Sequence, residues 1–282
     1  MSNKKLILII EDNFETSNIL KGIFEDHGFR VKQTYDGLSG LNFVKKNTPD
    51  LIVLDIILPD INGLTICKQL KIDNNTNLIP IIMLTGLTDN DNKLTGIRVG
   101  ADKYITKPFE IDNLLDEVND LLVWKDKITN LKCKEIINFI FNSEANYLDQ
   151  LDELISIPLK RTSLSDNEIV EVKTGLFEIV TNAIEWGNNF NKNLFVKIYY
   201  ELFNEYLTFS IMDQGSGFNC QEYLNKDYHP VEKQDERLNS GKRLGGFGIK
   251  IAKAFFDHLK YDYKNKKVIL KKNLIYSDII LS

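Results

Sequence analysis

The chain has 282 residues, of which 43% are hydrophobic, and it carries a formal net charge of -5. This length and apolar content are typical of about two domains with ordinary cores. The negative charge, a sequence pI near 5.4 and the lack of a dense Lys/Arg block argue against nucleic acid and anionic membranes as partners.

The sequence carries no recognisable signal for export, membrane insertion or disulfide bonding. The N-terminal apolar run stops at Glu11 and Asp12, which is too short for a secretory signal, and no stretch approaches the roughly 20 apolar residues that span a bilayer. Cys67, Cys133 and Cys220 are widely spaced and odd in number, which fits neither a disulfide framework nor a zinc site. We therefore expect a cytoplasmic protein.

Short apolar strands alternate with amphipathic helices from residue 5 to about residue 124. Strands are predicted at Leu6–Ile10, Arg30–Thr34, Leu51–Leu54, Ile79–Leu84 and Lys103–Thr106. The first helix is predicted from Phe14 to Asp26, because Gly28 is a good C-terminal stop signal. Five strands alternating with five helices indicate an α/β doubly wound, flavodoxin-like domain.

Helical spacing of apolar residues continues past the end of this first domain. The last helix begins near Ile111, and its apolar stripe runs to Leu131. The stripe is too short to favour a dimeric coiled coil over packing on its own domain. We predict a first domain over residues 1–124, a helical connector over 125–133 and a second domain over 134–282.

The order of elements changes in the second half of the chain. The pattern predicts, in order, a strand at 134–142, helices at 144–159 and 167–187, a hairpin of 196–203 and 207–212, a helix after Gly248 and a strand at 266–272. Between the hairpin and the last helix, residues 219–243 form a polar stretch of the length seen in functional or disordered loops. This grouping indicates an α+β two-layer sandwich.

Charged and hydroxyl side chains follow the predicted strands of the first half. Glu11 and Asp12 follow the first strand, Asp55 ends the third, Thr85 ends the fourth and Lys107 follows the fifth. In a doubly wound sheet, ligands bind at the carboxyl ends of the strands. Crowded carboxylates repel one another, and a hard cation such as Mg²⁺ would relieve this repulsion.

With Mg²⁺ present, Asp55 can attack a phosphoryl donor as a carboxylate nucleophile and form an aspartyl phosphate. Thr85 and Lys107 would then hold the phosphoryl oxygens, one by a hydroxyl group and one by its charge. Each residue alone is better explained as a helix cap or a solvated charge, but the whole set is not.

The segments "IIED", "LIVLDIILPDING", "IIMLTG" and "ADKYITKPF" resemble the receiver domain of bacterial response regulators. This resemblance implies that Asp55 is the phosphoacceptor and that Glu11, Asp12 and the backbone carbonyl of Ile57 coordinate Mg²⁺. It also implies that Thr85 and Tyr104 form a switch that reports phosphorylation. The alternative for Tyr104 is a half-buried aromatic residue without a switching role.

A second group of polar residues and glycines lies in the second half. Glu178 and Asn182 are four residues apart and share one face of a predicted helix. Asp213 ends an apolar strand and is followed by Gly215 and Gly217. A carboxylate there can accept a hydrogen bond from an adenine amino group, while the glycines let the base approach the backbone.

Gly246 and Gly248 lead into the predicted helix after the polar stretch, where free N–H groups suit phosphate. The order of these motifs resembles the GHKL-type (Bergerat) ATP-binding fold of gyrases and histidine kinases, over residues 134 to about 275. The resemblance implies that Asn182 ligates Mg²⁺ and that Asp213 reads the adenine of ATP.

The same resemblance implies that Glu178 is a general base and that residues 219–243 form a lid over the ATP. Lys242 and Arg243, at the end of the lid, are equally compatible with a γ-phosphate contact and with a solvated basic pair.

Histidine kinases require an acceptor histidine on a helical hairpin, and His27, His229 and His258 are all misplaced for this role. Gyrase-type enzymes require a large further domain, whereas this sequence stops at Ser282. The segments "EIVTNAIEWGNN", "MDQGSGFN" and "GGFGIKIAKAFFD" instead resemble the anti-sigma-factor serine/threonine kinases. Two departures are Trp186, where these kinases commonly have His, and the lack of a Gly-Thr pair before the last strand.

The sequence therefore predicts a two-component response regulator that a cognate sensor histidine kinase phosphorylates on Asp55. Its output domain would bind Mg-ATP and phosphorylate a Ser or Thr of a STAS-domain partner, and related proteins also bind sigma factors and pair as homodimers. The alternative is a nucleotide-bound module that sequesters a partner such as a sigma factor without phosphotransfer. Neither nucleic acid nor a membrane is expected as a partner.

Overall fold

The computed structural model describes residues 4–86, 98–144, 147–215 and 248–274. The chain divides into two compact units, and the boundary near residue 138 falls within a strand. Within the described ranges, we find no helix that combines the length and the apolar character needed to cross a membrane.

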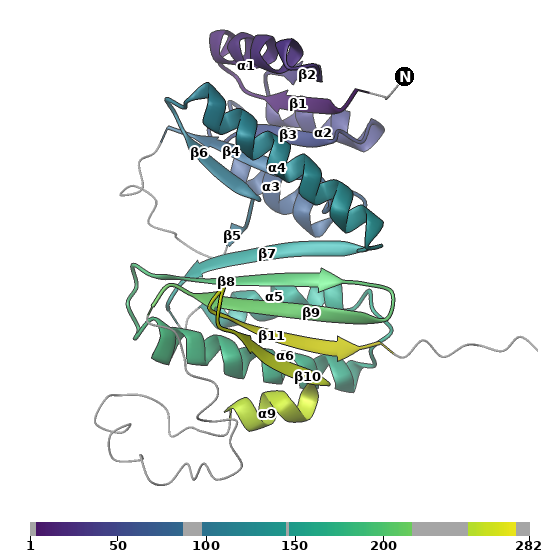
Figure 1. Cartoon of the computed structure of the whole chain (residues 1–282), viewed down its shortest axis with the longest axis vertical. Helices are drawn as coiled ribbons and strands as arrows, with labels where there is room; N and C mark the ends of the chain where they lie inside the picture. Colours follow the sequence, from purple (N-terminus) through teal and green to yellow (C-terminus); the bar gives the residue numbers. More distant parts are fainter. Residues whose placement is uncertain (1–3, 87–97, 145–146, 216–247, 275–282) are drawn as a thin grey trace, which may run out of the picture. The chain divides into compact units, whose positions relative to one another are not determined.

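The first unit contains a parallel five-stranded sheet in the order β2-β1-β3-β4-β6 (Figure 1). Its strands are β1 (Leu6–Ile10), β2 (Arg30–Thr34), β3 (Leu51–Asp55), β4 (Ile81–Thr85) and β6 (Lys103–Thr106). Its helices are α1 (Phe14–Asp26), α2 (Gly37–Lys46), α3 (Gly63–Ile72) and α4 (Ile111–Asn130), and β5 (Arg98–Val99) is a two-residue strand. This is the predicted α/β doubly wound fold; a helix between β4 and β5 would lie in residues 87–97, outside the described ranges.

The two faces of this sheet bury alternate residues of the same strand. Ile7 and Ile9 pack in one core with side chains of α1 and α4, whereas Leu8 and Ile10 pack in a second core with α2 and α3. Alternation with a period of two sends successive side chains to opposite faces, so a strand covered on both faces reads as a continuous apolar run. The order of strands reverses between β1 and β3, which sets the ligand position of this fold at their carboxyl ends.

Helix α4 extends without a break through most of the segment predicted as a connector. Lys125 on this helix donates hydrogen bonds to the carbonyls of Pro49 and Asp50, and Asp126 accepts one of 2.7 Å from Lys5. The helix ends at Asn130 with Leu131 as its C-cap, and Lys132 follows in the left-handed region with φ of 57°. The later turns of α4 are therefore attached to the first unit.

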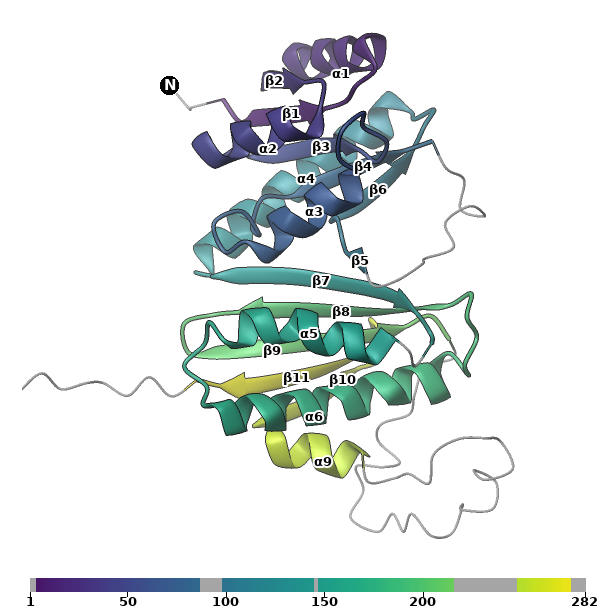
Figure 2. The same cartoon turned by 180° about the vertical axis from the view of Figure 1, so that it is seen from behind.

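The strands of the second unit follow the order β10-β11-β9-β8-β7, and its helices cover one face of the sheet (Figure 2). The strands are β7 (Glu135–Asn142), β8 (Phe195–Leu202), β9 (Tyr206–Asp213), β10 (His258–Asp262) and β11 (Lys267–Asn273). The helices are α5 (Tyr147–Leu159), α6 (Asp166–Asn182), the π-helix η1 (Ala183–Gly187) and α9 (Gly248–Phe255). The pairs β8–β9, β9–β11 and β10–β11 are antiparallel, which agrees with the predicted α+β sandwich.

Two elements of this unit differ from the prediction. Residues 167–187 were expected as one helix, but the last turn is the π-helix η1. Strand β10 was not predicted, because its sequence HLKYD contains few apolar residues. It lies at the sheet edge, where pairing with β11 needs little burial.

A capping box fixes the first turn of α6, the helix that carries Glu178 and Asn182. The Ser165 hydroxyl accepts a hydrogen bond from the backbone N–H of Glu168, and the Ser165 N–H donates to the Glu168 carboxylate at 2.8 Å. We expect Ser165→Ala to lower the free energy of unfolding by about 1 kcal/mol at neutral pH.

This loss should shrink in acid. The hydroxyl and the backbone N–H of Ser165 lower the pKa of Glu168 below its ordinary value of 4.5. The stabilisation by the carboxylate is thus present above the unfolded-state pKa and is lost as pH falls through the folded-state pKa. Urea unfolding at pH 7 and pH 3 measures both values, and an equal loss at both would contradict this account.

A buried ion pair joins α3 to the start of β6 in the first unit. The Lys71 ammonium lies 2.6 Å from an Asp102 carboxylate oxygen and also donates to the Ile79 carbonyl at 2.9 Å. Its side chain is only 2% exposed and that of Asp102 only 6%. We expect Lys71→Met to lower the free energy of unfolding by about 3–5 kcal/mol, because it leaves a buried carboxylate without its cation.

The matched control is Lys103→Met, which removes an ion pair with Glu117 that is more exposed. This change should cost less than about 1 kcal/mol in the same urea titration. Adding Asp102→Asn to Lys71→Met should recover part of the loss, and no recovery would argue against the buried charge as its cause.

Candidate functional site

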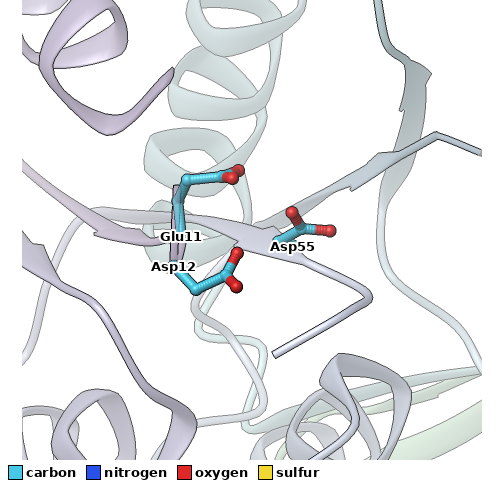
Figure 3. A group of neighbouring side chains, drawn as sticks. All are labelled: Glu11, Asp12 and Asp55. Atoms are coloured by element: carbon cyan, nitrogen blue, oxygen red, sulfur yellow. The ribbon is translucent and has the colours of Figure 1, made fainter. Parts of the chain in front are cut away.

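Three carboxylates gather at the carboxyl ends of β1 and β3. Figure 3 shows Glu11, Asp12 and Asp55, which offer ligand oxygens that all lie within 4.8 Å of one another. Glu11 is 1% exposed and Asp55 is 7% exposed, while Asp12 is open to solvent. Their meeting point is the edge where the strand order reverses.

Lys107, which follows β6, completes this cluster. Its ammonium lies 2.7 Å from Glu11 Oε2 and 2.5 Å from Asp55 Oδ2. Burial raises the pKa of Glu11, and the nearby Asp55 charge adds to the rise although Lys107 opposes it. Burial acts to lower the pKa of Lys107, but its hydrogen bonds to Asp55 and Glu11 outweigh that effect and the pKa is raised.

The cluster has the properties of a divalent cation site. One lysine contacts two of the three carboxylates, and among the described residues Glu11 Oε1 is buried without a hydrogen-bond partner. A buried acceptor without a partner is costly unless an ion or a water satisfies it. Hard oxygen ligands of this kind suit Mg²⁺, so these residues fit the predicted metal.

The other predicted residues of this site also lie at or near the carboxyl ends of the strands. The Ile57 N–H donates to Asp55 Oδ1 at 3.1 Å, which places Ile57 in the turn beside the acceptor. Thr85 is buried at the end of β4, and its carbonyl accepts a hydrogen bond from the Lys107 N–H at 2.7 Å. Tyr104 lies on β6 with 38% of its surface exposed.

In the second unit, Glu178 and Asn182 on α6 meet the first residue of α9. A Cβ atom on Gly248 would lie 2.5 Å from Glu178 Oε2 and 3.4 Å from Asn182 Nδ2. Glycine therefore lets the start of α9 approach Glu178 without displacing the Glu178 carboxylate. The helix face predicted from sequence is thus directed at a helix N-terminus, which is a favourable position for phosphate groups.

Asn182 and Asp213 line one pocket in the second unit. Its other lining residues are Ile179, Ala183, Ile211, Tyr261, Lys266 and Val268. The pocket therefore combines apolar walls with a few polar groups, which is the usual composition of a small-molecule site.

The π-helix η1 brings the backbone of Gly187 against the Asp213 carboxylate. A Cβ on Gly187 would lie 2.6 Å from Asp213 Oδ2, and a Cβ on Gly215 would collide with the Gly187 carbonyl oxygen. Asn188 holds this loop, since its Oδ1 accepts from the Gln214 N–H at 2.9 Å and its Nδ2 donates to Ser143 Oγ at 2.6 Å.

Sequence reasoning missed several residues of this region, namely Ser143, Gly187, Asn188, Tyr261 and Lys266. The Gly187–Asn188 pair at the end of η1 was an available signal, since such pairs mark helix ends. Several predictions lie outside the described residues: Gly217, Lys242, Arg243, Gly246 and the lid over 219–243.

Comparison with known families agrees with both halves of this description. Residues 7–119 match the response regulator receiver domain, and residues 141–272 match the histidine kinase-like ATPase domain. The chain therefore contains a receiver domain followed by a histidine kinase-like ATPase domain, which confirms the predicted fusion.

Individual relatives match less than half of the chain. The DNA-binding dual master transcriptional regulator RpaA of Synechocystis sp. is 40% identical over 133 residues, which are 47% of this chain and 55% of that protein. The response regulator ArlR of Staphylococcus saprophyticus is 41% identical over 116 residues, or 41% of this chain and 51% of that protein. The chain thus spans about half the length of these curated relatives.

Among solved structures, a putative response regulator from Chloroflexus aurantiacus is 30% identical with a TM-score of 0.40. The match covers 43% of this chain and 99% of that one.

Proposed function

We propose that this response regulator has a protein serine/threonine kinase as its output. The observation that carries the proposal is that one chain contains two sites, one suited to accept a phosphoryl group and one suited to bind a nucleotide. One is the cluster of Glu11, Asp12 and Asp55 with Lys107, and the other is the pocket of Asn182 and Asp213.

At the first site, a cognate sensor histidine kinase would supply the phosphoryl group. An Asp55 carboxylate oxygen attacks the phosphorus atom, and the phosphorus–nitrogen bond breaks with its electron pair passing to the imidazole. Mg²⁺, when bound, would neutralise charge on the phosphoryl oxygens. The residues proposed to hold it are Glu11, Asp12, Asp55 and the backbone carbonyl of Ile57.

Lys107 and Thr85 would bind the phosphoryl oxygens once the aspartyl phosphate has formed. Lys107 already contacts Asp55, and Thr85 ends the neighbouring strand. Thr85 and Tyr104 would then report the modification to the surface of the receiver domain, since one is buried at the site and the other is partly exposed.

At the second site, Asp213 would accept a hydrogen bond from the adenine amino group and Asn182 would ligate Mg²⁺. Glu178 would take the proton of a Ser or Thr hydroxyl on the protein substrate. The hydroxyl oxygen attacks the γ-phosphorus atom, and the bond to the bridging oxygen breaks so that ADP leaves with the electron pair. The residues proposed to approach the base and phosphates are Gly215, Gly217, Arg243, Gly246 and Gly248.

The proposed substrate is a STAS-domain protein, and a sigma factor is a further candidate partner. This assignment rests on the resemblance of the Glu178–Asn182, Asp213 and Gly248 segments to anti-sigma-factor kinases. The second half of the chain matches an ATPase domain, which favours output through a protein partner in the cytoplasm over direct DNA binding.

A nucleotide-bound sequestering module is the second candidate function. The observation in its favour is that Lys266 lines the pocket directly before β11, where many of the kinases that this half resembles have a Gly-Thr pair. An altered nucleotide contact is compatible with tight retention of ATP or ADP without transfer.

The test is phosphorylation in a lysate of the source cells. Purified protein, γ-labelled ATP and Mg²⁺ are added with and without a phosphoryl mimic on Asp55, and the products are washed in acid. An acid-stable band that disappears with Glu178→Ala supports the kinase and identifies its substrate. Absence of this band in both receiver states, with ATP still bound, favours the sequestering module.

A further inference from the structure

The pocket of Asn182 and Asp213 contains a cation that the proposed kinase chemistry does not use. Lys266 lines this pocket, together with Tyr261. Tyr261 lies on β10, and Lys266 lies in the turn between β10 and β11, where it is exposed.

The register of the sheet brings Lys266 near the end of β9 that carries Asp213. Strands β9 and β11 are antiparallel, with Val268 paired to Ile211 and Lys267 paired to Met212. Lys266 and Asp213 are the next residue on each side beyond this last pair, and both line the pocket. An acidic and a basic residue therefore lie on neighbouring segments at one end of the pocket.

Side-chain hydrogen bonds hold the turn that presents Lys266. Asp262 Oδ1 accepts from the N–H groups of Lys264 at 3.1 Å and Asn265 at 3.2 Å, and Oδ2 accepts from Asn265 Nδ2 at 2.7 Å. Lys266 itself has φ of 48°, in the left-handed region. The rings of Tyr261 and Tyr263 pack edge to face with centroids 4.7 Å apart. The backbone position of Lys266 is thus set by a hydrogen-bonded turn.

We propose that Lys266 is a specificity-determining residue that donates a hydrogen bond to N1 of the adenine base. The proposal rests on the proposed function, in which Asp213 accepts from the adjacent 6-amino group. Adenine presents a donor next to an acceptor on this edge, and a carboxylate next to an ammonium group is the complementary order. Tyr261 and the apolar walls would contact the faces of the ring.

This arrangement of an acceptor at Asp213 beside a donor at Lys266 disfavours purines that carry a carbonyl group at C6. Hypoxanthine and guanine present an oxygen to Asp213 and an N1–H donor to Lys266, so both positions would be mismatched. Leaving polar groups unpaired in a site is a strong source of discrimination. The pocket should therefore select adenine nucleotides through two residues.

The experiment is a double-mutant cycle in which one change is made in the protein and the other in the ligand. Binding of ADP and of 1-deaza-ADP, in which N1 is replaced by CH, is measured by calorimetry on the full chain with Mg²⁺. The variant is Lys266→Met, and the matched control is Lys264→Met, an exposed lysine of the same turn that does not line the pocket. ADP avoids phosphotransfer during the titration.

We expect Lys266→Met to weaken ADP binding about tenfold and the loss of N1 to weaken binding to the native chain by a similar factor. The two changes together should cost no more than either alone, and Lys264→Met should have no effect. Lys266→Arg, which keeps a donor, should retain part of the preference for ADP.

Provided that ADP binds the native chain, the proposal is overturned if Lys266→Met does not weaken ADP binding. It is also overturned if replacing ADP by 1-deaza-ADP weakens binding to Lys266→Met by the same factor as it weakens binding to the native chain. The latter would identify Lys266 as a general charge contact. Tighter binding of GDP than ADP would also overturn it. If the native chain binds no nucleotide, the proposed function itself fails, which is a distinct outcome.

Discussion

Asp55→Asn is expected to abolish incorporation of phosphate into the receiver domain from a small phosphodonor such as acetyl phosphate. An amide has neither the charge nor the nucleophilicity of the carboxylate, and Asp55 is the member of the cluster that contacts Lys107 while ending β3. Labelling with Mg²⁺ present, followed by hydroxylamine treatment, measures the acyl phosphate directly. Labelling should fall to background.

The matched control for Asp55→Asn is Asp126→Asn. Asp126 is a carboxylate on α4 that pairs with Lys5 outside the acidic cluster, so labelling should be unchanged. Chelation of Mg²⁺ should abolish labelling of the native chain as Asp55→Asn does, if the cluster uses the cation. Hydroxylamine-sensitive label that persists in Asp55→Asn would place the acceptor on another residue.

Glu178→Gln is expected to reduce phosphotransfer to the protein substrate by about 10²- to 10⁴-fold while nucleotide binding remains. The amide keeps the size of the side chain beside Gly248 but cannot take a proton. Asn182→Ala should instead abolish metal-dependent nucleotide binding, because Asn182 lines the pocket itself. Transfer assays and calorimetry on the two variants separate these effects.

Glu171→Gln is the control for Glu178→Gln, since it makes the same change two turns earlier on α6. It should leave both transfer and binding intact. Loss of nucleotide binding in Glu178→Gln would assign Glu178 a role in holding the nucleotide, and unchanged transfer would require a different base.

Strand prediction succeeded where the local pattern of apolar residues indicates which side chains are buried. Strands β1 and β2 have the predicted bounds, because a parallel strand between two helix layers reads as an apolar run or a bounded alternation. Strand β4 was predicted from Ile79 but begins at Ile81. Pro80 has no N–H to donate to the sheet, so pairing starts after it.

Sequence alone determined the class of each half and most of the residue types at the two sites. Strand-end carboxylates in the first half and the Glu178–Asn182 spacing in the second are local patterns with a known period, so they can be read without coordinates.

Tertiary structure decided which of these residues meet and which others join them. Lys107 contacts Glu11 across 96 positions of sequence, and Gly248 closes on Glu178 from a separate helix. Lys266 and Asp213 line one pocket because β9 and β11 pair in an antiparallel register. Such contacts depend on strand order, on register and on the π-helix η1 after Asn182, and no short-range sequence pattern encodes them.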